Sequence, residues 1–262
     1  MKLHFYKYHG TGNDFILADN RDGYATLSPE NIASLCHRRF GIGADGLILL
    51  EAKTGYDFGM RYFNSDGNES TMCGNGGRCI TAFADFLSPQ GRNYRFHAID
   101  GEHTGIILGK NGGCYDIKLK MNDVTSYKNW GEDIILNTGS PHLVRFVSDT
   151  NTLDVVKEGR ELRFHPDFQP AGLNINFVKP GGGSLFVRTY ERGVEDETLS
   201  CGTGVTASAL AYALKQGLPG GSVNVETPGG SLKVQFGPVP GGFTDIWLEG
   251  PAVKVFEGDI EI

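Results

Sequence analysis

The chain has 262 residues, a formal net charge of −7 and a sequence pI of about 5.5. This acidic balance argues against nucleic acid as a partner, because no surplus of Lys and Arg exists to displace counterions from phosphates. A hydrophobic content of 39% and a charged content of 21% are typical of globular proteins. No stretch approaches the roughly 20 apolar residues that a membrane span requires, and the first ten residues lack the apolar core of a signal peptide.

The cysteines are odd in number and scattered, which argues against a disulfide framework. We therefore expect free thiols and a cytoplasmic protein in a reducing compartment. The sequence has neither a Cys-x-x-Cys motif nor a cysteine–histidine cluster with zinc spacing, so we expect no metal site. By default Cys36, Cys79 and Cys114 are expected in the core, which leaves Cys73 and Cys201 for chemistry.

Taken in chain order, the sequence indicates short strands interrupted by a few helices. The first strands are expected at 3–9, 14–18, 46–51 and 58–64. Ser28 and Pro29 are an N-cap and first helical residue, and they predict a helix that runs to about Phe40 and stops at Gly41. A three-strand meander is expected at 94–99, 103–108 and 115–120, and glycine-rich turns mark hairpins at 110–113 and 180–184.

Two segments of the chain are imperfect copies of each other. Residues 61–78 and 188–205 each begin with arginine and lead to a Cys-Gly-x-Gly sequence, at Cys73 and Cys201. A glutamate, Glu69 or Glu197, precedes each cysteine by four residues. After each cysteine apolar residues recur at helical spacing, which predicts a helix beginning at each glycine run.

The duplication predicts an α+β protein made of two pseudo-symmetric mixed α/β lobes. Each lobe is expected to be a mostly antiparallel sheet wrapped around a central helix, because the helix at 202–216 has almost no charged face. We expect residues 1–120 to form the N-terminal lobe, with a final strand at 252–262 returning to it. Residues 121–251 form the C-terminal lobe in this prediction.

A cysteine at a helix N-terminus lies beside unpaired N–H groups and the positive end of the helix dipole, which favours the thiolate. The glycines that follow, Gly74 and Gly202 first, let a ligand approach those N–H groups, and a carboxylate is the ligand that suits them. Two such thiols on opposite faces of one carbon, about 6–7 Å apart, can remove a proton from one face and add it to the other. The sequence therefore predicts a two-base proton-transfer site.

Other polar residues lie where a core is not expected to place them. Asn13 belongs to a short polar loop, Asn64 and Glu191 occupy matching positions in the two copies, and Asn174 falls within a predicted strand. Arg192 supplies a planar fork suited to a second carboxylate. His142 is either a loop residue or a group that tunes a thiol.

Together these segments resemble diaminopimelate epimerases. The resemblance rests on His-Gly-Thr-Gly-Asn-Asp-Phe at 9–15, Gly-Ile-Gly-Ala-Asp-Gly-Leu at 41–47, Tyr-Phe-Asn-Ser-Asp-Gly at 62–67, Met-Cys-Gly-Asn-Gly-Gly-Arg-Cys at 72–79, Gly-Ser-Pro-His at 139–142, Asn-Ile-Asn-Phe-Val at 174–178 and the stretch 188–204. It implies an epimerase without cofactors, which interconverts LL- and meso-diaminopimelate on the route to lysine and peptidoglycan.

Carried over by position, the resemblance makes Cys73 and Cys201 the two acid/base residues. It implies that the backbone N–H groups of two dipeptides, Gly74-Asn75 and Gly202-Thr203, hold the reacting-end carboxylate. The other implied substrate contacts are Asn13, Asn64, Asn174, Glu191 and Arg192, and the residues implied to tune the cysteines are His142 and Glu191.

The chain departs from the family pattern at Ser140, where many members have asparagine, and at Gly46, where some have glutamine. Three other readings remain open: a proline racemase-like enzyme, an isomerase of the phenazine-biosynthesis type, and a non-catalytic amino-acid-binding or thiol-redox protein. The expected partner is a small amino-acid substrate, with no nucleic acid or membrane, and a homodimer is the candidate assembly.

Overall fold

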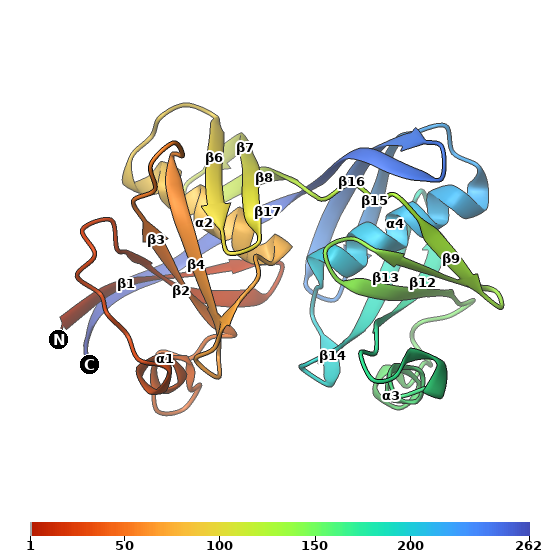
Figure 1. Cartoon of the computed structure of the whole chain (residues 1–262), viewed down its shortest axis with the longest axis horizontal. Coiled ribbons are helices and arrows are strands. Elements are labelled where there is room, and N and C mark those ends of the chain that lie inside the picture. Colours follow the sequence, from red (N-terminus) through yellow and green to blue (C-terminus); the bar gives the residue numbers. More distant parts are fainter. Residues whose placement is uncertain (1) are drawn as a thin grey trace. The chain divides into compact units, whose positions relative to one another are not determined.

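The computed structural model describes residues 2–262, which divide into two compact units (Figure 1). The first unit comprises residues 2–119 together with Gly250–Ile262, and the second comprises Lys120–Glu249. The chain therefore passes from the first unit to the second after Leu119 and returns within its last strand.

The first part of the chain forms β1 (Lys2–Gly10), β2 (Asn13–Asp19), α1 (Pro29–Cys36), β3 (Gly46–Glu51), β4 (Phe58–Asn64), β5 (Glu69–Ser70), α2 (Gly74–Leu87), β6 (Asn93–Ala98), β7 (Gly101–Asn111) and β8 (Cys114–Lys120). The remainder forms β9 (Tyr127–Trp130), β10 (Asp133–Asn137), β11 (Pro141–Phe146), α3 (Val155–Arg163), the short 3-10 helix η1 (Pro166–Phe168), β12 (Asn174–Gly181), β13 (Ser184–Glu191), β14 (Asp196–Thr198), α4 (Gly202–Gln216), β15 (Gly221–Thr227), β16 (Gly230–Val239) and β17 (Gly242–Glu261).

Both units follow one order of strand pairing. In the first, β1 is antiparallel to β2, β2 is parallel to β3 across α1, β3 is antiparallel to β4, and β4 is parallel to β6 across α2. In the second, β10, β11, β12, β13 and β15 repeat these relations with α3 and α4 as the crossover helices. The prediction of a duplicated α+β architecture is confirmed.

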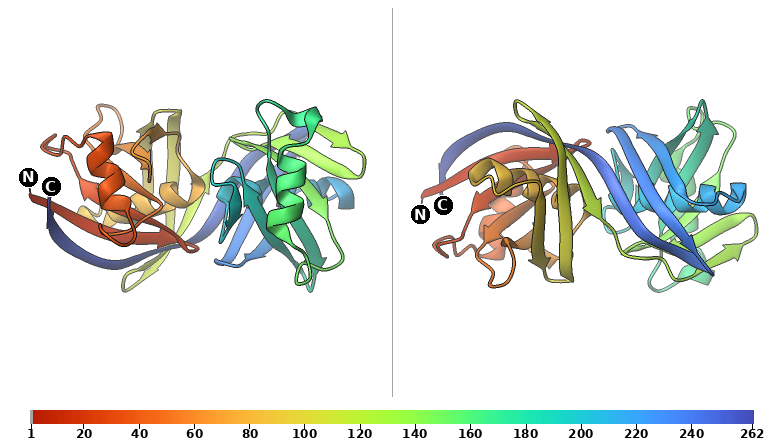
Figure 2. Two further views of the ribbon diagram at one scale, coloured as in Figure 1. Left: turned by 90° about the horizontal axis from the view of Figure 1, so that it is seen from below. Right: turned by 90° about the horizontal axis from the view of Figure 1, so that it is seen from above.

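The last strand, β17, contributes to both units. Its first half pairs with β16 in the second unit, where Phe243 also bridges to Val124. Its second half pairs with β1, from Lys2 opposite Glu261 to His9 opposite Val253, and with β8. The two ends of the described chain therefore lie side by side (Figure 2).

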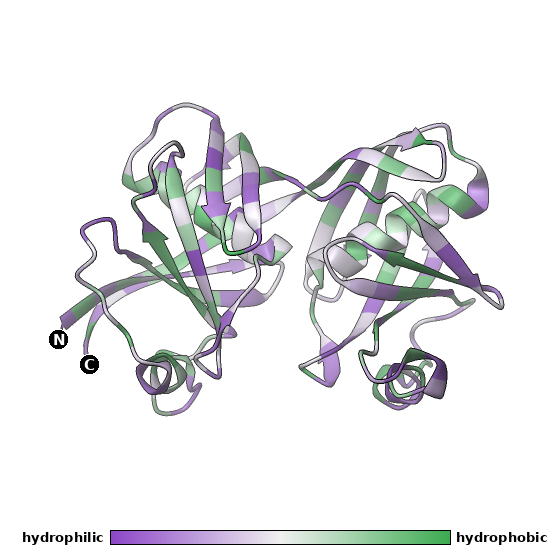
Figure 3. Ribbon diagram, viewed as in Figure 1, coloured by the Kyte–Doolittle hydropathy of each residue, from purple (hydrophilic) through white to green (hydrophobic). Residues whose placement is uncertain are grey.

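Each unit wraps its sheet around one helix. Every residue of α2 from Gly74 to Asp85 is buried, and α4 buries Val205, Leu210 and Ala211 completely. β3 is apolar up to Glu51 (Figure 3), as a strand covered on both faces must be, and the first five residues of β12 are likewise buried. The helices α1 and α3 lie outside the wrapped sheets and cover separate apolar clusters.

Two expectations about the first unit were wrong. The helix that begins at Ser28 ends at Cys36, not near Phe40, because residues 37–43 turn back so that Gly43 and Ala44 bond to the carbonyls of α1. Cys114 is exposed at the start of β8, beside the hairpin turn, and is therefore not a core residue. Cys36 and Cys79 are buried as predicted.

We expect Gly159→Ala to destabilise the second unit. A Cβ at this position of α3 would lie 2.4 Å from the Cβ of Tyr190, which is on β13 and cannot swing away. Overpacking costs about 1–3 kcal/mol, and this outweighs the better helix propensity of alanine, which is worth about 1 kcal/mol. Urea unfolding should show a net loss, whereas Gly181→Ala, which meets no atom within 4 Å, should change the free energy of unfolding by less than about 0.5 kcal/mol. Unchanged stability in Gly159→Ala would contradict this packing.

Candidate functional site

Cys73 is the N-cap residue of α2. Its backbone is extended, and its sulfur accepts a hydrogen bond from the N–H of Gly76 at 3.2 Å. The sulfur thus occupies the position of the side-chain oxygen in a usual cap. The helix start offers its dipole and the first-turn N–H groups of Gly74 and Asn75 to an anion.

Asn13 and Asn75 lie beside this sulfur. The Oδ1 of Asn13 is 4.0 Å from the Cys73 Sγ and accepts a hydrogen bond from the Asn75 Nδ2 at 3.1 Å. The Nδ2 of Asn13 in turn donates to Asp45 at 2.7 Å. The structure therefore brings together four of the predicted residues: Asn13, Cys73, Gly74 and Asn75.

A buried arginine, Arg78, lies one turn further along α2 and was not predicted from the sequence. Its side chain is completely buried, and its guanidinium donates to four neutral oxygens, those of Gly74, Pro251, Thr11 and Asn75.

Burial lowers the pKa of Arg78 to about 10, so the group still carries its positive charge at neutral pH. A fixed cation therefore lies close to the start of α2, where it favours a thiolate or a bound carboxylate.

The polar loop between β1 and β2 depends on this arrangement. A Cβ on Gly10 would lie 3.0 Å from an Arg78 nitrogen and 3.2 Å from the Asn75 carbonyl oxygen, so glycine allows the loop to approach α2. Thr11 holds a left-handed backbone with φ of 49°, and its hydroxyl accepts from Arg78. The His9–Asp14 segment is therefore built to pack on the start of the buried helix.

Cys201 is the N-cap residue of α4 and is buried. Its sulfur lies 3.4 Å from the Thr203 hydroxyl oxygen, which is itself 2.9 Å from the Nε2 of His142. The predicted association of His142 with a thiol thus runs through the side chain of Thr203. First-turn N–H groups of Gly202 and Thr203 occupy positions equivalent to those of Gly74 and Asn75.

His142 is fully buried on β11. Burial, reinforced by the positive charge of Arg192, lowers the pKa of His142 to about 3. Its Nδ1 is 3.1 Å from the Nδ2 of Asn176, a second residue that was not predicted. A signal existed in the sequence, because Asn176 interrupts the same apolar strand in which Asn174 was singled out.

Asn174 and Arg192 are joined in the second unit. Asn174 donates to the Ser140 hydroxyl at 2.8 Å and to the Pro141 carbonyl, and its oxygen accepts from the backbone N–H of Arg192 at 2.8 Å. The guanidinium of Arg192 donates through Nη1 to the Ala171 carbonyl at 3.2 Å. Asn174 therefore holds the backbone of Arg192, and the Ser140 hydroxyl accepts a hydrogen bond from the Asn174 amide.

Glu191 and Asn64 end equivalent strands, β13 and β4. The Glu191 carboxylate accepts from the Thr198 hydroxyl at 2.9 Å, whereas Asn64 is exposed and its strand pairs it with Gly46. A Cβ on Gly46 would lie 2.6 Å from the ring of Tyr62 and 2.5 Å from the Phe63 carbonyl oxygen. No side chain fits there, so the glutamine contact of some relatives has no counterpart in this chain.

The hairpins that lead to the two cysteines carry matching ion pairs. Arg61 on β4 pairs with Glu69 on β5 at 3.1 Å, and Arg188 on β13 pairs with Glu197 on β14 at 2.6 Å. The repeated Arg and Glu positions in the sequence are therefore explained by cross-strand pairing. Each pair holds the short strand from which the chain reaches its N-cap cysteine.

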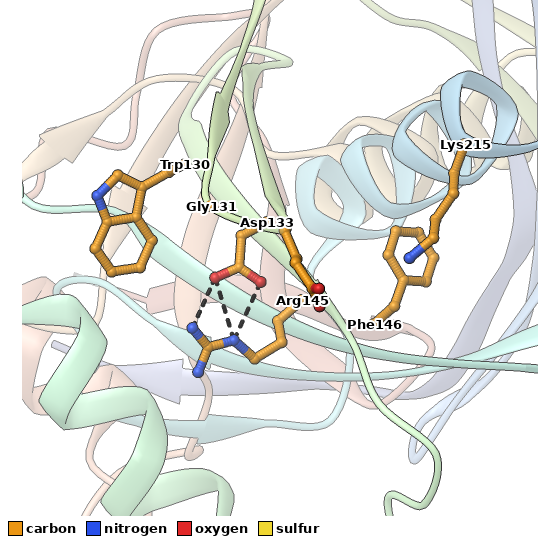
Figure 4. Close-up of a pocket in the computed structure, with 7 residues that line it drawn as sticks. Trp130, Gly131, Asp133, Arg145, Phe146 and Lys215 are labelled. Atoms are coloured by element: carbon orange, nitrogen blue, oxygen red, sulfur yellow. Dashed lines mark hydrogen bonds and ion pairs between the residues drawn. The ribbon is translucent and has the colours of Figure 1, made fainter.

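A separate open pocket of about 420 Å³ lies in the second unit (Figure 4). In it Arg145 pairs with Asp133 at 2.7 Å, and the Lys215 ammonium lies 4.7 Å from the centre of the Phe146 ring. None of the predicted site residues lines it. Within residues 2–262 the structure contains no group of three or more His, Cys, Asp or Glu side chains arranged to hold a metal, and no helix long and apolar enough to cross a membrane.

The neutral state of buried His142 makes stability depend on pH. Its folded pKa of about 3 lies below the ordinary value of 6.5, so the unfolded state binds the extra proton and stability is lost as pH falls below about 6.5. We expect this residue to contribute a loss of about 1.4 kcal/mol between about pH 7.5 and 5.5. Urea unfolding should show that the free energy of unfolding falls over this pH range by that much more in the wild type than in His142→Gln. Parallel pH profiles would show that the imidazole takes up its proton in the folded protein.

The chain is similar in sequence to known proteins over nearly its whole length. The sequence profile described as diaminopimelate epimerase matches residues 5–124 and 134–255. The diaminopimelate epimerase of Flavobacterium psychrophilum is 48% identical over 262 residues, covering 99% of this chain and 100% of that protein. That of Chlorobaculum tepidum is 40% identical over 263 residues, covering 97% and 99%.

Solved structures share the fold at low sequence identity. A phenazine biosynthesis protein from Bacillus anthracis aligns with a TM-score of 0.76 at 15% identity, covering 100% of both chains. A hydroxyproline epimerase from Agrobacterium vitis aligns with a TM-score of 0.71 at 16% identity, covering 99% of this chain and 92% of that one. With its fold, its paired cysteine helix starts and its full-length relatives, the chain belongs to the diaminopimelate epimerase family.

Proposed function

We propose that this protein is an isomerase that interconverts LL- and meso-diaminopimelate by moving the proton on one α-carbon. The observation that carries the proposal is the duplicated helix start, with Cys73 and Cys201 as N-caps of α2 and α4, in a chain that belongs to this family. The product would serve lysine and peptidoglycan precursor synthesis, and we expect the reaction to take place in the cytoplasm.

The reaction proceeds by two bases in this proposal. One cysteine, as thiolate, removes the α-proton, and the other, as thiol, delivers a proton to the opposite face. The two then exchange roles for the reverse reaction, and their titrations belong to the pair. This chemistry requires both sulfurs to reach the same carbon and needs no further proton carrier, so we propose that the enzyme works without a cofactor.

The carboxylate next to the reacting carbon would bind the first-turn N–H groups of Gly74, Asn75, Gly202 and Thr203. Removing the α-proton moves negative charge onto that carboxylate, and N–H groups fixed at a helix start stabilise the charge without reorganising. The buried guanidinium of Arg78 adds a positive charge near α2. We assign the amino-group and remote-end contacts to Asn13, Asn64, Asn174, Glu191 and Arg192.

Arg192 is the residue that we propose to recognise the distal carboxylate. Its backbone is fixed by Asn174 and its Nη1 by the Ala171 carbonyl, so the guanidinium is oriented before substrate binds. Such an oriented fork suits bidentate pairing with a carboxylate. A substrate that lacks this group, such as proline, would leave the arginine without its partner.

Both cysteines should be essential for epimerisation. In deuterated water the wild type should exchange the α-hydrogen of LL-diaminopimelate and form the meso isomer, as followed by NMR and chiral chromatography. Cys73→Ala and Cys201→Ala should each lose at least about 10³-fold in turnover, because each removes one proton-transfer group. Cys114→Ser changes an exposed thiol outside the site and serves as the control. Near wild-type epimerisation by Cys201→Ala would rule out the two-base mechanism.

Arg192→Ala should lower kcat/KM for diaminopimelate. The corresponding loss of transition-state binding free energy should be about 2–5 kcal/mol, as expected for a charged pair that loses one partner. Arg192→Lys keeps the charge but loses the planar fork, so it should be impaired to a smaller degree. Arg160→Ala, which removes an exposed arginine from α3, is the matched control. Proline and hydroxyproline are tested in parallel. An unchanged kcat/KM in Arg192→Ala would mean that another group reads the distal carboxylate.

A further inference from the structure

Asn176 is a completely buried amide whose orientation can be deduced from its partners. Its Nδ2 lies 3.0 Å from the Leu143 carbonyl oxygen, which can only accept a hydrogen bond, so this end of the amide must be the NH2 group. Its Oδ1 accepts from the hydroxyl of Thr189, the residue opposite it on β13, at 3.0 Å. The second hydrogen of Nδ2 therefore points at the Nδ1 of His142, 3.1 Å away.

This orientation determines the proton position on His142. The Nδ1 receives a hydrogen bond, so it carries no proton, and the neutral ring must hold its single proton on Nε2. That Nε2–H donates to the Thr203 Oγ1 at 2.9 Å. The Thr203 hydroxyl has then accepted one hydrogen bond, and its own hydrogen is available to the Cys201 sulfur, 3.4 Å away.

We propose that Asn176 is a positioning residue that fixes the tautomer of His142 and thereby turns the Thr203 hydroxyl into a hydrogen-bond donor to Cys201. A donor aimed at sulfur stabilises the thiolate relative to the thiol. The catalytic meaning of this arrangement rests on the proposed function of Cys201, but the hydrogen-bond polarity does not. Two charged groups lie near this network. They are Arg192, whose positive charge acts on His142, and Glu191, which ends β13.

The duplicated unit shows that the fold itself does not require this network. Gly76 and Gly204 hold the same position in the two Cys-Gly-x-Gly motifs. A Cβ on Gly76 would meet Ile48 at 3.2 Å, whereas a Cβ on Gly204 would meet the Asn176 Oδ1 at 2.4 Å. Apolar Ile48 thus occupies in the first unit the place that Asn176 has in the second, and the Cys73 sulfur takes its donor from the Gly76 backbone instead.

The tautomer is tested directly by long-range ¹H–¹⁵N correlation spectra of histidine-labelled protein at pH 7, with His142 assigned by comparison with His142→Gln. We expect the Nε2–H form in the wild type. Asn176→Asp is nearly isosteric but offers an acceptor to Nδ1, so His142 should carry a proton on Nδ1 in this variant. A wild-type ring protonated on Nδ1, or doubly protonated, would overturn the proposal.

The effect on Cys201 is tested by alkylation with iodoacetamide, resolved by peptide mass spectrometry over a range of pH. Thr203→Val removes the hydroxyl and should raise the midpoint of Cys201 alkylation by about one pH unit, a tenfold change expected from a hydrogen bond to a charged group. Thr203→Ser should restore it. Thr206→Val makes the same change on the same helix, where the hydroxyl donates only to the Gly202 carbonyl, and should leave the midpoint unchanged.

These outcomes separate the inference from the proposed function. Equal Cys201 midpoints in Thr203→Val and Thr203→Ser would refute the hydroxyl donor, whatever the tautomer. The expected tautomer and midpoint in a protein that does not epimerise diaminopimelate would instead retain the inference and reject the function.

Discussion

The chemistry of this protein depends on one constraint, which is that a helix buried inside a sheet must satisfy its first N–H groups locally. Strands cover α2 and α4 along most of their length, so water cannot reach the sides of these helices. Their N-termini are the places where polar groups can remain available. A cysteine as N-cap followed by glycine leaves N–H groups, the helix dipole and a sulfur close together. The N–H groups and the dipole can bind an α-carboxylate, and the sulfur can exchange the proton on the adjacent carbon.

The two copies of this device are not supported in the same way. In the first, the Cys73 sulfur accepts a hydrogen bond from the backbone N–H of Gly76, and the buried guanidinium of Arg78 supplies positive charge close by. In the second, a neutral imidazole and a threonine hydroxyl take part, and their hydrogen bonds are oriented by a buried asparagine. A reaction that alternates between thiolate and thiol has no need for identical surroundings at its two bases. The two copies have the same backbone arrangement, but the side chains around each sulfur differ.

Strand ends supply the remaining polar groups. Asn13 begins β2, Asn64 ends β4, Asn174 begins β12 and Glu191 ends β13. At such positions a side chain leaves the packed sheet while its backbone remains held by neighbouring strands, so the residues that we propose as substrate contacts have rigid support. The hairpins with Arg61–Glu69 and Arg188–Glu197 pairs extend this support to the residues that precede each cysteine.

The sequence by itself determined the duplication, the buried helices and the two cysteines, because these features repeat at short range and follow local rules of helix initiation and periodicity. It also indicated His142, Asn174 and Arg192 as residues unlike their surroundings. It did not identify Arg78 or Asn176, whose roles depend on partners far away in the chain, such as Pro251 for Arg78 and His142 for Asn176. It misplaced Cys114 and the end of α1 because exposure and chain reversal are decided by neighbouring strands. Only the tertiary structure decides which way a buried hydrogen bond points, since that direction is set by every partner around it.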